Sequence, residues 1–144
     1  MPKHRFYYLL QTASHRLGRH AEKVCSEQLG VSAVQLGALF ELARRPGCSQ
    51  RDLAKVLDIN ESAVTTLVGR LERASVVRRE RSSSDARVVL LYATPSGLKI
   101  VKRAGPLLRR FNTQLARGFS AEELSTVARF LEQVARLPRE GEVG

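Results

Sequence analysis

Hydrophobic side chains recur at three- and four-residue steps between residues 5 and 29. This spacing places them on one face of an α-helix, opposite a polar face. The apolar positions are Phe6, Leu9, Leu10, Ala13, Leu17, Ala21 and Val24. Gly30 follows, and glycine readily takes the left-handed conformation that ends a helix. The pattern predicts one long amphipathic helix whose apolar stripe needs something to pack against.

Two shorter helices follow, each introduced by a serine that can cap it. Ser32 and Gln35 have the spacing of a capping box at the start of a second helix, which Pro46 and Gly47 end. Its expected buried face consists of Leu36, Leu39, Phe40 and Ala43. Ser49 begins a third helix over residues 49–57. Its inward positions are Leu53, Ala54 and Leu57.

A fourth helix is predicted over residues 60–74, after a turn at residues 58–60. Asn60 is a favourable N-cap, and the apolar positions follow an i, i+3, i+4, i+7 pattern. These positions are Val64, Leu67, Val68 and Leu71. The opposite face carries short hydroxyl side chains near its start and arginines further along: Ser62, Thr65, Thr66, Gly69, Arg70 and Arg73.

Two runs rich in β-branched and aromatic residues come next, at residues 76–81 and 88–93, and predict a hairpin around a polar loop. Thr94 and Pro95 then begin a fifth helix that continues to about residue 117. A capping box from Ser120 begins a sixth helix, and residues 139–144 are expected to fray. The predicted fold is mainly α with a small β-hairpin wing (α+β). It is a winged helix-turn-helix flanked by N- and C-terminal helices.

The charge of the chain favours a polyanion as its partner. The 144 residues carry a formal net charge of +10 and a sequence pI of about 10.6. Basic side chains that neutralise phosphates release counterions, which drives binding to nucleic acid. The alternative is a charge that only keeps the protein in solution. No apolar run approaches the roughly 20 residues of a membrane span, and no export signal is visible, so a cytoplasmic location is expected.

The polar face of the fourth helix suits the reading of a DNA groove. Short side chains let a helix approach the base edges, and arginine can bind guanine with two hydrogen bonds or grip a phosphate. The alternative is an ordinary solvated face. Arginines also surround the hairpin loop, and a basic tip of this kind can enter a narrow minor groove. Asp85 lies two residues before Arg87 and could hold that guanidinium by a bidentate pair. A flexible hairpin with scattered charge is the alternative.

The sequence offers little for enzyme or metal chemistry. Cys25 and Cys48 form no spacing motif, and no metal site, cofactor motif or catalytic constellation is visible. Cys25 is expected to be a buried structural thiol. Cys48, in the loop before the third helix, could be exposed and oxidisable. His15 and His20 are five residues apart, which does not place both on one helix face. The chain is therefore expected to be neither an enzyme nor a metal sensor.

The whole pattern resembles the MarR family, the multiple-antibiotic-resistance type of bacterial transcription regulator. Nearly the full chain takes part in the resemblance. The matching pieces are residues 29–32 with Gln35, Ser49-Gln50 with Asp52-Leu53-Ala54, Ser62-Ala63-Val64-Thr65, Leu67-Val68 with Arg70-Leu71-Glu72, Asp85-Ala86-Arg87, and Thr94-Pro95-Ser96-Gly97. The Asp-x-Arg wing followed closely by Thr-x-x-Gly is the sharpest of them.

The resemblance implies a homodimer that represses transcription at a palindromic operator in double-stranded DNA, and that responds to a small molecule or an oxidant. It divides the chain into a dimerisation helix (1–31), the winged helix-turn-helix (32–94) and C-terminal dimerisation helices (95–144). Together with the residue pattern it gives a set of DNA-contacting candidates. They are Ser49, Gln50, Asn60, Ser62, Thr65, Thr66, Arg70, Arg73, Arg81, Ser83, Asp85 and Arg87.

Three positions depart from the family pattern. Ser75 stands where relatives usually have glycine, so it must adopt a left-handed conformation or end the helix differently. Thr66 replaces a frequent arginine, which would change the base preference. Ala86 replaces a second basic residue of the wing.

The resemblance also suggests an effector site for a small anionic aromatic molecule. Arg16 matches a basic position that some relatives use to bind phenolic carboxylates, and Tyr8, His15 and Phe40 could supply walls. Arg16 could equally form a salt bridge or face water, and Ala33 stands where relatives often have tyrosine. Tyr8 also takes the place of the reactive cysteine of hydroperoxide-sensing relatives.

Two functions from other classes compete with this interpretation. One is a protein-interaction module that kept the winged-helix shape but lost DNA reading, which Ser75 and Ala86 would favour. The other is a cysteine redox enzyme, which the missing partner motif argues against.

Overall fold

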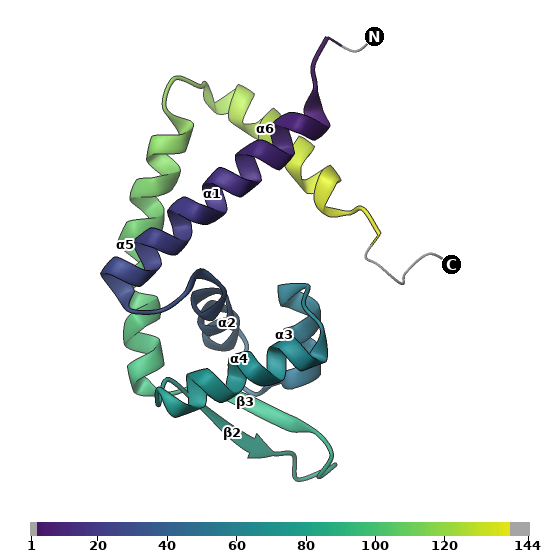
Figure 1. Ribbon diagram of the computed structural model, residues 1–144, viewed down its shortest axis with the longest axis vertical. Coiled ribbons are helices and arrows are strands. Elements are labelled where there is room, and N and C mark those ends of the chain that lie inside the picture. Colours follow the sequence, from purple (N-terminus) through teal and green to yellow (C-terminus); the bar gives the residue numbers. More distant parts are fainter. Residues whose placement is uncertain (1–2, 139–144) are drawn as a thin grey trace. The chain divides into compact units, whose positions relative to one another are not determined.

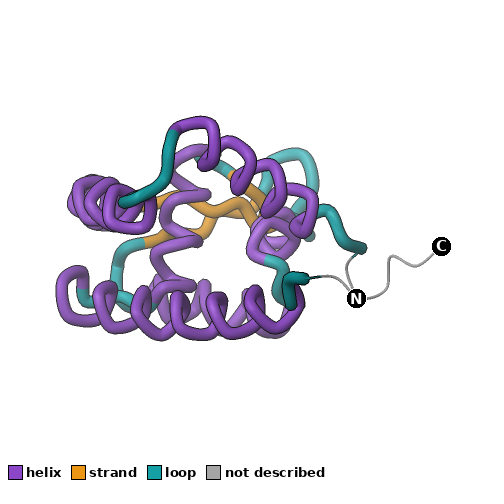
Figure 2. The backbone as a smooth tube through the Cα atoms, turned by 90° about the horizontal axis from the view of Figure 1, so that it is seen from above, coloured by secondary structure: helices purple, strands orange, loops and turns teal. Residues whose placement is uncertain are grey.

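The computed structural model describes residues 3–138 and is mainly helical with a small antiparallel sheet (Figures 1 and 2). The elements are α1 (Phe6–Leu29), α2 (Ala33–Arg44), β1 (Cys48–Ser49), α3 (Gln50–Leu57), α4 (Glu61–Arg73), β2 (Val77–Arg81), β3 (Val89–Ala93), α5 (Pro95–Ala116) and α6 (Ala121–Ala135). The predicted fold class is confirmed. Residues 139–144, where a frayed tail is expected, lie outside the described residues.

The chain divides into two compact units, residues 1–105 and 106–144. The first unit holds α1, the winged helix and the beginning of α5. The second holds the rest of α5 and α6. No described helix is long and apolar enough to cross a membrane.

The helix starts follow the local signals in the sequence. Ser32 and Gln35 form the expected capping box, and so do Ser120 and Glu123. The hydroxyl of Ser49 accepts a hydrogen bond from the Asp52 amide at 3.0 Å. Each of these caps satisfies amide groups that the first turn of a helix leaves free.

The sheet has three strands in the order β1-β3-β2, with both pairs antiparallel. The hairpin of β2 and β3 is the predicted wing. Strand β1 is not expected from the sequence, because two residues are too short to show a period. It forms because Cys48 pairs with Leu91 across the sheet, which is a contact between distant parts of the chain.

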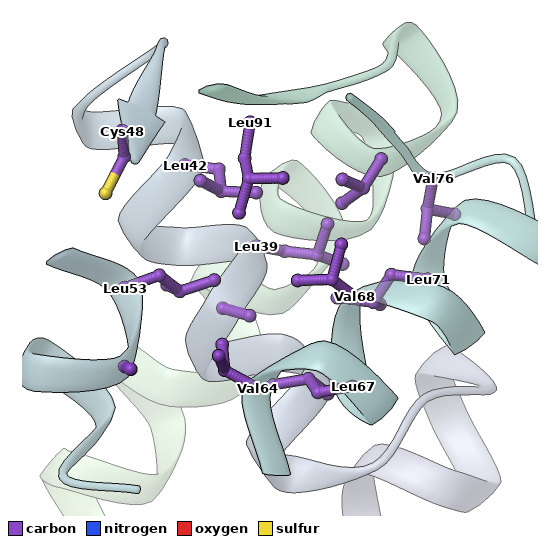
Figure 3. Close-up of a cluster of buried hydrophobic side chains, with 13 residues drawn as sticks. Leu39, Leu42, Cys48, Leu53, Val64, Leu67, Val68, Leu71, Val76 and Leu91 are labelled. Carbon is purple, nitrogen blue, oxygen red and sulfur yellow. The ribbon is translucent and has the colours of Figure 1, made fainter. Parts of the chain in front are cut away.

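A single hydrophobic core holds the winged helix together (Figure 3). In the close-up, leucines and valines from α2, α3, α4 and β3 point toward one another. The largest fully buried side chains of the described residues are Leu39, Leu42, Leu53, Leu71, Leu91, Val64, Val68 and Val77. Each stabilises the fold by about 1.5–3 kcal/mol relative to an exposed position. The core therefore fixes α3 and α4 against the sheet.

The buried face of α2 differs from the expected one. Leu39 is buried as expected, but Leu36, Phe40 and Ala43 are only partly buried. Ala38, Glu41 and Leu42 are buried in addition. The physical reason is that α2 contacts α1, α3 and β3 together, so its buried surface is wider than one stripe. Glu41 can be buried because Arg44 donates to both of its carboxylate oxygens, at 2.8 and 3.0 Å.

The start of α5 is locked to the turn that follows α4. The Thr94 hydroxyl donates to the Ser75 carbonyl at 2.7 Å and accepts from the Gly97 amide at 3.2 Å. A side chain at Gly97 would collide with the backbone carbonyl of Val76, so only glycine fits there. The Thr-x-x-Gly sequence is thus explained by close packing of two backbone segments.

Large apolar side chains remain exposed in both units. In α1, Phe6, Leu9 and Leu17 are about half exposed. In the described part of the second unit, the exposed large apolar residues are Leu108, Leu115, Phe119, Val127, Leu131 and Leu137, and no α6 residue is buried. Surfaces of this kind usually mark an interaction site.

Candidate nucleic-acid interface

Helices α3 and α4 form the helix-turn-helix at the centre of the candidate interface (Figure 1). The turn between them depends on Asp58, which takes a left-handed conformation with φ of 55°. Asn60 then caps α4, because its Oδ1 accepts from the Ala63 amide at 2.7 Å. Val64, Leu67, Val68 and Leu71 point into the core, as predicted.

Burying one face of α4 leaves the opposite face to solvent. The exposed residues on that face are Ser62, Thr65, Thr66, Arg70 and Arg73, and Gly69 is partly buried. Arg70 and Arg73 form no ion pair with any residue between 3 and 138. Their guanidinium groups are therefore available to an external anion or base.

Two of the predicted contact residues are joined by a hydrogen bond across the helix-turn-helix. The Gln50 amide at the start of α3 donates from Nε2 to Thr65 Oγ1 on α4 at 2.9 Å. The Thr65 hydroxyl in turn donates to the Glu61 carbonyl at 2.8 Å. The Thr66 hydroxyl lies 3.3 Å from the Ser62 carbonyl, a longer contact. The first two bonds fix the orientation of Thr65 on the exposed face.

An ion pair fastens α4 to the wing. Glu72 near the end of α4 accepts two hydrogen bonds from Arg79 on β2, at 3.0 and 3.1 Å. Those hydrogen bonds lower the pKa of the Glu72 carboxyl below its ordinary value. The sequence does not predict this pair. Glu72 and Arg79 lie seven positions apart on different elements, with a left-handed turn between them. No helix or strand spacing therefore indicates the pair.

Arg87 extends outward from the loop of the wing. Asp85 Oδ1 accepts from the Arg87 backbone amide at 3.0 Å and from Arg87 Nε at 3.2 Å, while Nη2 lies 3.5 Å from Oδ2. The expected pair is therefore present, and the backbone bond, followed by the side-chain bonds, lowers the pKa of Asp85. The Arg87 side chain is still 91% exposed. Asp85 holds its guanidinium in place without hiding it.

The other wing residues differ in how many contacts their side chains already make within the protein. Arg81 ends β2, is exposed and makes no ion pair in the described part of the chain. Ser83 is also exposed, between Ser82 and Ser84, whose hydroxyls lie 2.9 Å apart. Arg78 is more engaged, because it pairs with Glu80 at 2.9 Å and lies over the Tyr92 ring at 4.2 Å.

Two predicted contact residues already use their side chains for hydrogen bonds within the protein. Ser49 and Asn60 use their side-chain oxygens as helix caps, and Ser49 is partly buried. A DNA contact from either residue would have to use its remaining hydrogen-bonding capacity. Their role at the interface stays a prediction, as does that of the other candidates.

Ser75 resolves the choice that the sequence left open. Its φ is +61°, so it adopts the left-handed conformation in place of the usual glycine. Its amide donates to the Glu72 carbonyl at 2.9 Å, and its carbonyl accepts from Thr94. The recognition helix therefore ends as the glycine-containing pattern would require.

Both cysteines are free and buried, at 7% exposure for Cys25 and 4% for Cys48. The expectation for Cys25 is confirmed. The expectation that Cys48 could be exposed is wrong, because its segment pairs with β3 rather than forming an open loop. Burial raises the pKa of both thiols above the ordinary value, which makes them poor nucleophiles. The part of the chain that the structure describes contains no cluster of metal-binding side chains.

The predicted effector residues lie in the first unit. Tyr8, His15 and Arg16 are exposed on α1, and Phe40 is partly buried on α2. The guanidinium of Arg5 lies 4.5 Å from the centre of the Tyr8 ring. Within residues 3–138, no hydrogen bond or ion pair joins the four to one another. The effector site stays a prediction.

A helix-turn-helix with a buried core face and an exposed basic face, followed by a hairpin wing in a three-stranded sheet, defines a winged helix-turn-helix protein. Residues 29–88 match the sequence model of the MarR family. Over these residues the chain is similar to the MarR family.

Named relatives agree with this assignment. A putative transcriptional regulatory protein for the hcr operon of Thauera aromatica is 29% identical over 107 residues, which cover 74% of this chain and 64% of that protein. The transcriptional repressor Rv2887 of Mycobacterium tuberculosis is 27% identical over 106 residues, or 74% of this chain and 76% of the repressor.

A solved structure shows the same fold. The structure of S. aureus MepR in complex with DNA superimposes with a TM-score of 0.84 at 25% identity. The superposition covers 94% of this chain and 100% of the MepR chain.

Proposed function

We propose that this chain is a MarR-family transcriptional regulator that forms a homodimer. The dimer binds a palindromic operator in double-stranded DNA and represses transcription there. The observation that carries the proposal is the exposed face of α4. It presents hydroxyls and unpaired arginines, while its opposite face is anchored in the core. A helix held in this way can enter the major groove without changing shape. A repressor of this kind works in the cytoplasm.

The charges of the interface support duplex DNA as the ligand. Arg70 and Arg73 on α4 and Arg87 on the wing lie on elements that a winged helix directs to DNA. Arg87 is suited to a minor groove, since its guanidinium is both exposed and oriented by Asp85. The related MepR chain has been seen bound to DNA with the same fold.

The exposed apolar residues favour a homodimer, in which a second copy of the chain is the partner. Phe6, Leu9 and Leu17 on α1 and the apolar residues of the second unit would be covered in a dimer. We therefore retain residues 1–31 and 95–144 as dimerisation segments around a DNA-binding domain at 32–94. A two-fold dimer presents two recognition helices to half-sites about one helical turn apart.

A small molecule is the favoured signal for release from DNA. Cys25 and Cys48 are buried and their pKa values are raised, which argues against an oxidant as the signal. Arg16 is exposed on α1 and could bind a carboxylate, so an anionic aromatic compound remains the proposed effector class.

The interaction-module alternative has lost its main support. Ser75 adopts the left-handed conformation, so its departure from glycine does not displace α4. Ala86 leaves the Asp85–Arg87 pair intact. Neither change removes the exposed basic face.

Selection of genomic fragments with the purified protein tests the proposal. We expect enrichment of a short palindrome, a complex that contains two chains per duplex, and an affinity that falls steeply with salt. Repeating the selection with aromatic carboxylates such as salicylate should weaken recovery. Recovery of random fragments, or none, at modest ionic strength would contradict a sequence-specific regulator.

A further inference from the structure

The hydroxyl group of Thr65 is already occupied inside the protein. Its hydrogen is donated to the Glu61 carbonyl at 2.8 Å, and its oxygen accepts from Gln50 Nε2 at 2.9 Å. A threonine hydroxyl has one hydrogen to donate and two lone pairs. The Thr65 hydroxyl therefore has no hydrogen left for an acceptor on a base.

This result holds for either orientation of the Gln50 amide. Gln50 Oε1 is buried and has no hydrogen-bond partner. Turning the amide by 180° would bring its oxygen to Thr65, and the Thr65 hydroxyl would then donate to Gln50 rather than to Glu61. The hydrogen is used within the protein in both arrangements.

The methyl group is the part of Thr65 that remains for an external contact. Thr65 is exposed on the polar face of α4, and its hydroxyl is turned toward the backbone and α3. Its β-branched side chain has few rotamers, so fixing the hydroxyl also fixes the methyl. In a major groove, thymine is the base that presents a methyl group, at C5, and threonine methyls can pack against it.

We infer that Thr65 recognises a thymine through a methyl–methyl contact, with Gln50 acting as the positioning residue that fixes its rotamer. The inference rests on the proposed DNA-binding function and names how one position of the operator is read. Two kinds of side chain on α4 would then have different roles. Arginines supply hydrogen bonds and charge, whereas Thr65 supplies an apolar contact specific for thymine.

The competing role for Thr65 is that of a hydrogen-bond donor to a base acceptor. That role would require its bond to Glu61 or Gln50 to break when DNA binds. A new bond to a base would only replace the bond that was broken, with no net gain. The methyl contact needs no rearrangement.

Replacing single methyl groups on both molecules tests the inference. The probe is a duplex from the fragment selection, with each thymine pair of the palindrome replaced in turn by 2′-deoxyuridine. Wild-type protein should lose about fourfold in affinity per half-site at one thymine, since a buried methyl-sized group is worth about 0.8 kcal/mol. Thr65→Ser removes only the protein methyl, and it should bind the thymine and uracil duplexes equally at that position.

Two further variants separate the methyl from the hydroxyl and the rotamer. Thr65→Val keeps a methyl and loses the hydroxyl, so it should keep the preference for thymine. Gln50→Ala removes one of the two bonds that fix the Thr65 rotamer, so the ratio of thymine to uracil affinity should fall. Thr66→Ser is the matched control, because it deletes a methyl one residue away and should not abolish the preference at the same thymine.

The outcomes distinguish this inference from the function on which it rests. If duplexes are selected but no thymine shows a uracil effect that Thr65→Ser removes, the methyl contact is wrong and DNA binding stands. Loss of the preference in Thr65→Val but not in Thr65→Ser would assign the reading to the hydroxyl and overturn the inference. If no duplex is selected, both the proposed function and the inference fail.

Discussion

Ser75 shows how a single residue can carry strain at the end of a recognition helix. Its φ of +61° lies in the left-handed region, which is unfavourable for a residue with a Cβ by about 1–2 kcal/mol. Ser75→Gly should therefore raise the free energy of unfolding by about 1 kcal/mol, after allowance for the greater freedom of glycine in the unfolded chain. Denaturant unfolding at fixed protein concentration measures this.

The matched control for Ser75→Gly is Ser83→Gly in the wing loop. Ser83 is exposed and does not have a positive φ, so glycine there should bring no gain. Equal effects of the two substitutions, or a loss of stability in Ser75→Gly, would show that the left-handed conformation is not strained.

The Asp85 carboxyl makes the stability of the fold depend on pH. The Arg87 backbone amide and then its guanidinium lower the pKa of the Asp85 carboxyl below its ordinary value of 3.8. A depressed pKa in the folded state adds stability above the unfolded pKa, and this is lost as the pH falls through the folded pKa. The window is therefore below about pH 4. Titration of the Asp85 carboxyl by NMR should show a midpoint below 3.8.

Arg87→Ala separates the two causes of that shift. The backbone amide of residue 87 remains in the variant, and it is the larger cause, so the Asp85 midpoint should rise only part of the way. An Asp85 midpoint at or above the ordinary value in the wild type would mean that the wing loop does not hold this pair.

At the level of elements, the turn after α4 packs closely against the start of α5 at Gly97. A Cβ at Gly97 would meet the Val76 carbonyl oxygen of the backbone, which cannot move without shifting the wing. Gly97→Ala should destabilise the fold by about 2 kcal/mol, in the range of other overpacking changes. Thermal unfolding at fixed concentration measures the loss.

Gly69→Ala is the control for this prediction. Gly69 lies within α4 with open space around its Cα, so alanine should be neutral or stabilise the helix by up to about 1 kcal/mol. If Gly97→Ala unfolds at the wild-type temperature, the close approach of the two backbone segments is not real.

The helices and their caps could be predicted from the sequence because their signals are local. Ser32, Asn60 and Ser120 each precede an amphipathic pattern, and each caps a helix in the structure. The hairpin and the Asp85–Arg87 pair also depend on neighbouring residues.

Features that depend on distant residues could not be predicted in the same way. Strand β1 exists only because β3 lies beside it, and it buries Cys48, which was expected in a loop. The buried face of α2 is set by three neighbouring elements. The bonds from Glu72 to Arg79 and from Gln50 to Thr65 join separate elements, so only the folded chain reveals them.

For the whole molecule, the exposed apolar residues are the surface that the proposed dimer would cover. Leu17 on α1 is 44% exposed, and a charge there would have to be buried in the proposed dimer. Leu17→Glu should shift sedimentation equilibrium from dimer toward monomer by at least tenfold in the dissociation constant. Ser14→Glu, an exposed polar position on the same helix, is the control.

A wild-type chain that sediments as a monomer at micromolar concentration would contradict the dimer. An unchanged dissociation constant in Leu17→Glu would instead place the interface elsewhere on the chain.

The most direct test of a wing that reads DNA is a titration of the selected palindromic duplex, at fixed salt, with Arg87→Ala and Arg129→Ala. Each variant loses one positive charge, but Arg87 extends from the wing while Arg129 lies on α6 in the second unit. We expect Arg87→Ala to weaken binding by tenfold or more and Arg129→Ala to bind within about twofold of the wild type. Equal affinities for the two variants would contradict a DNA-reading wing.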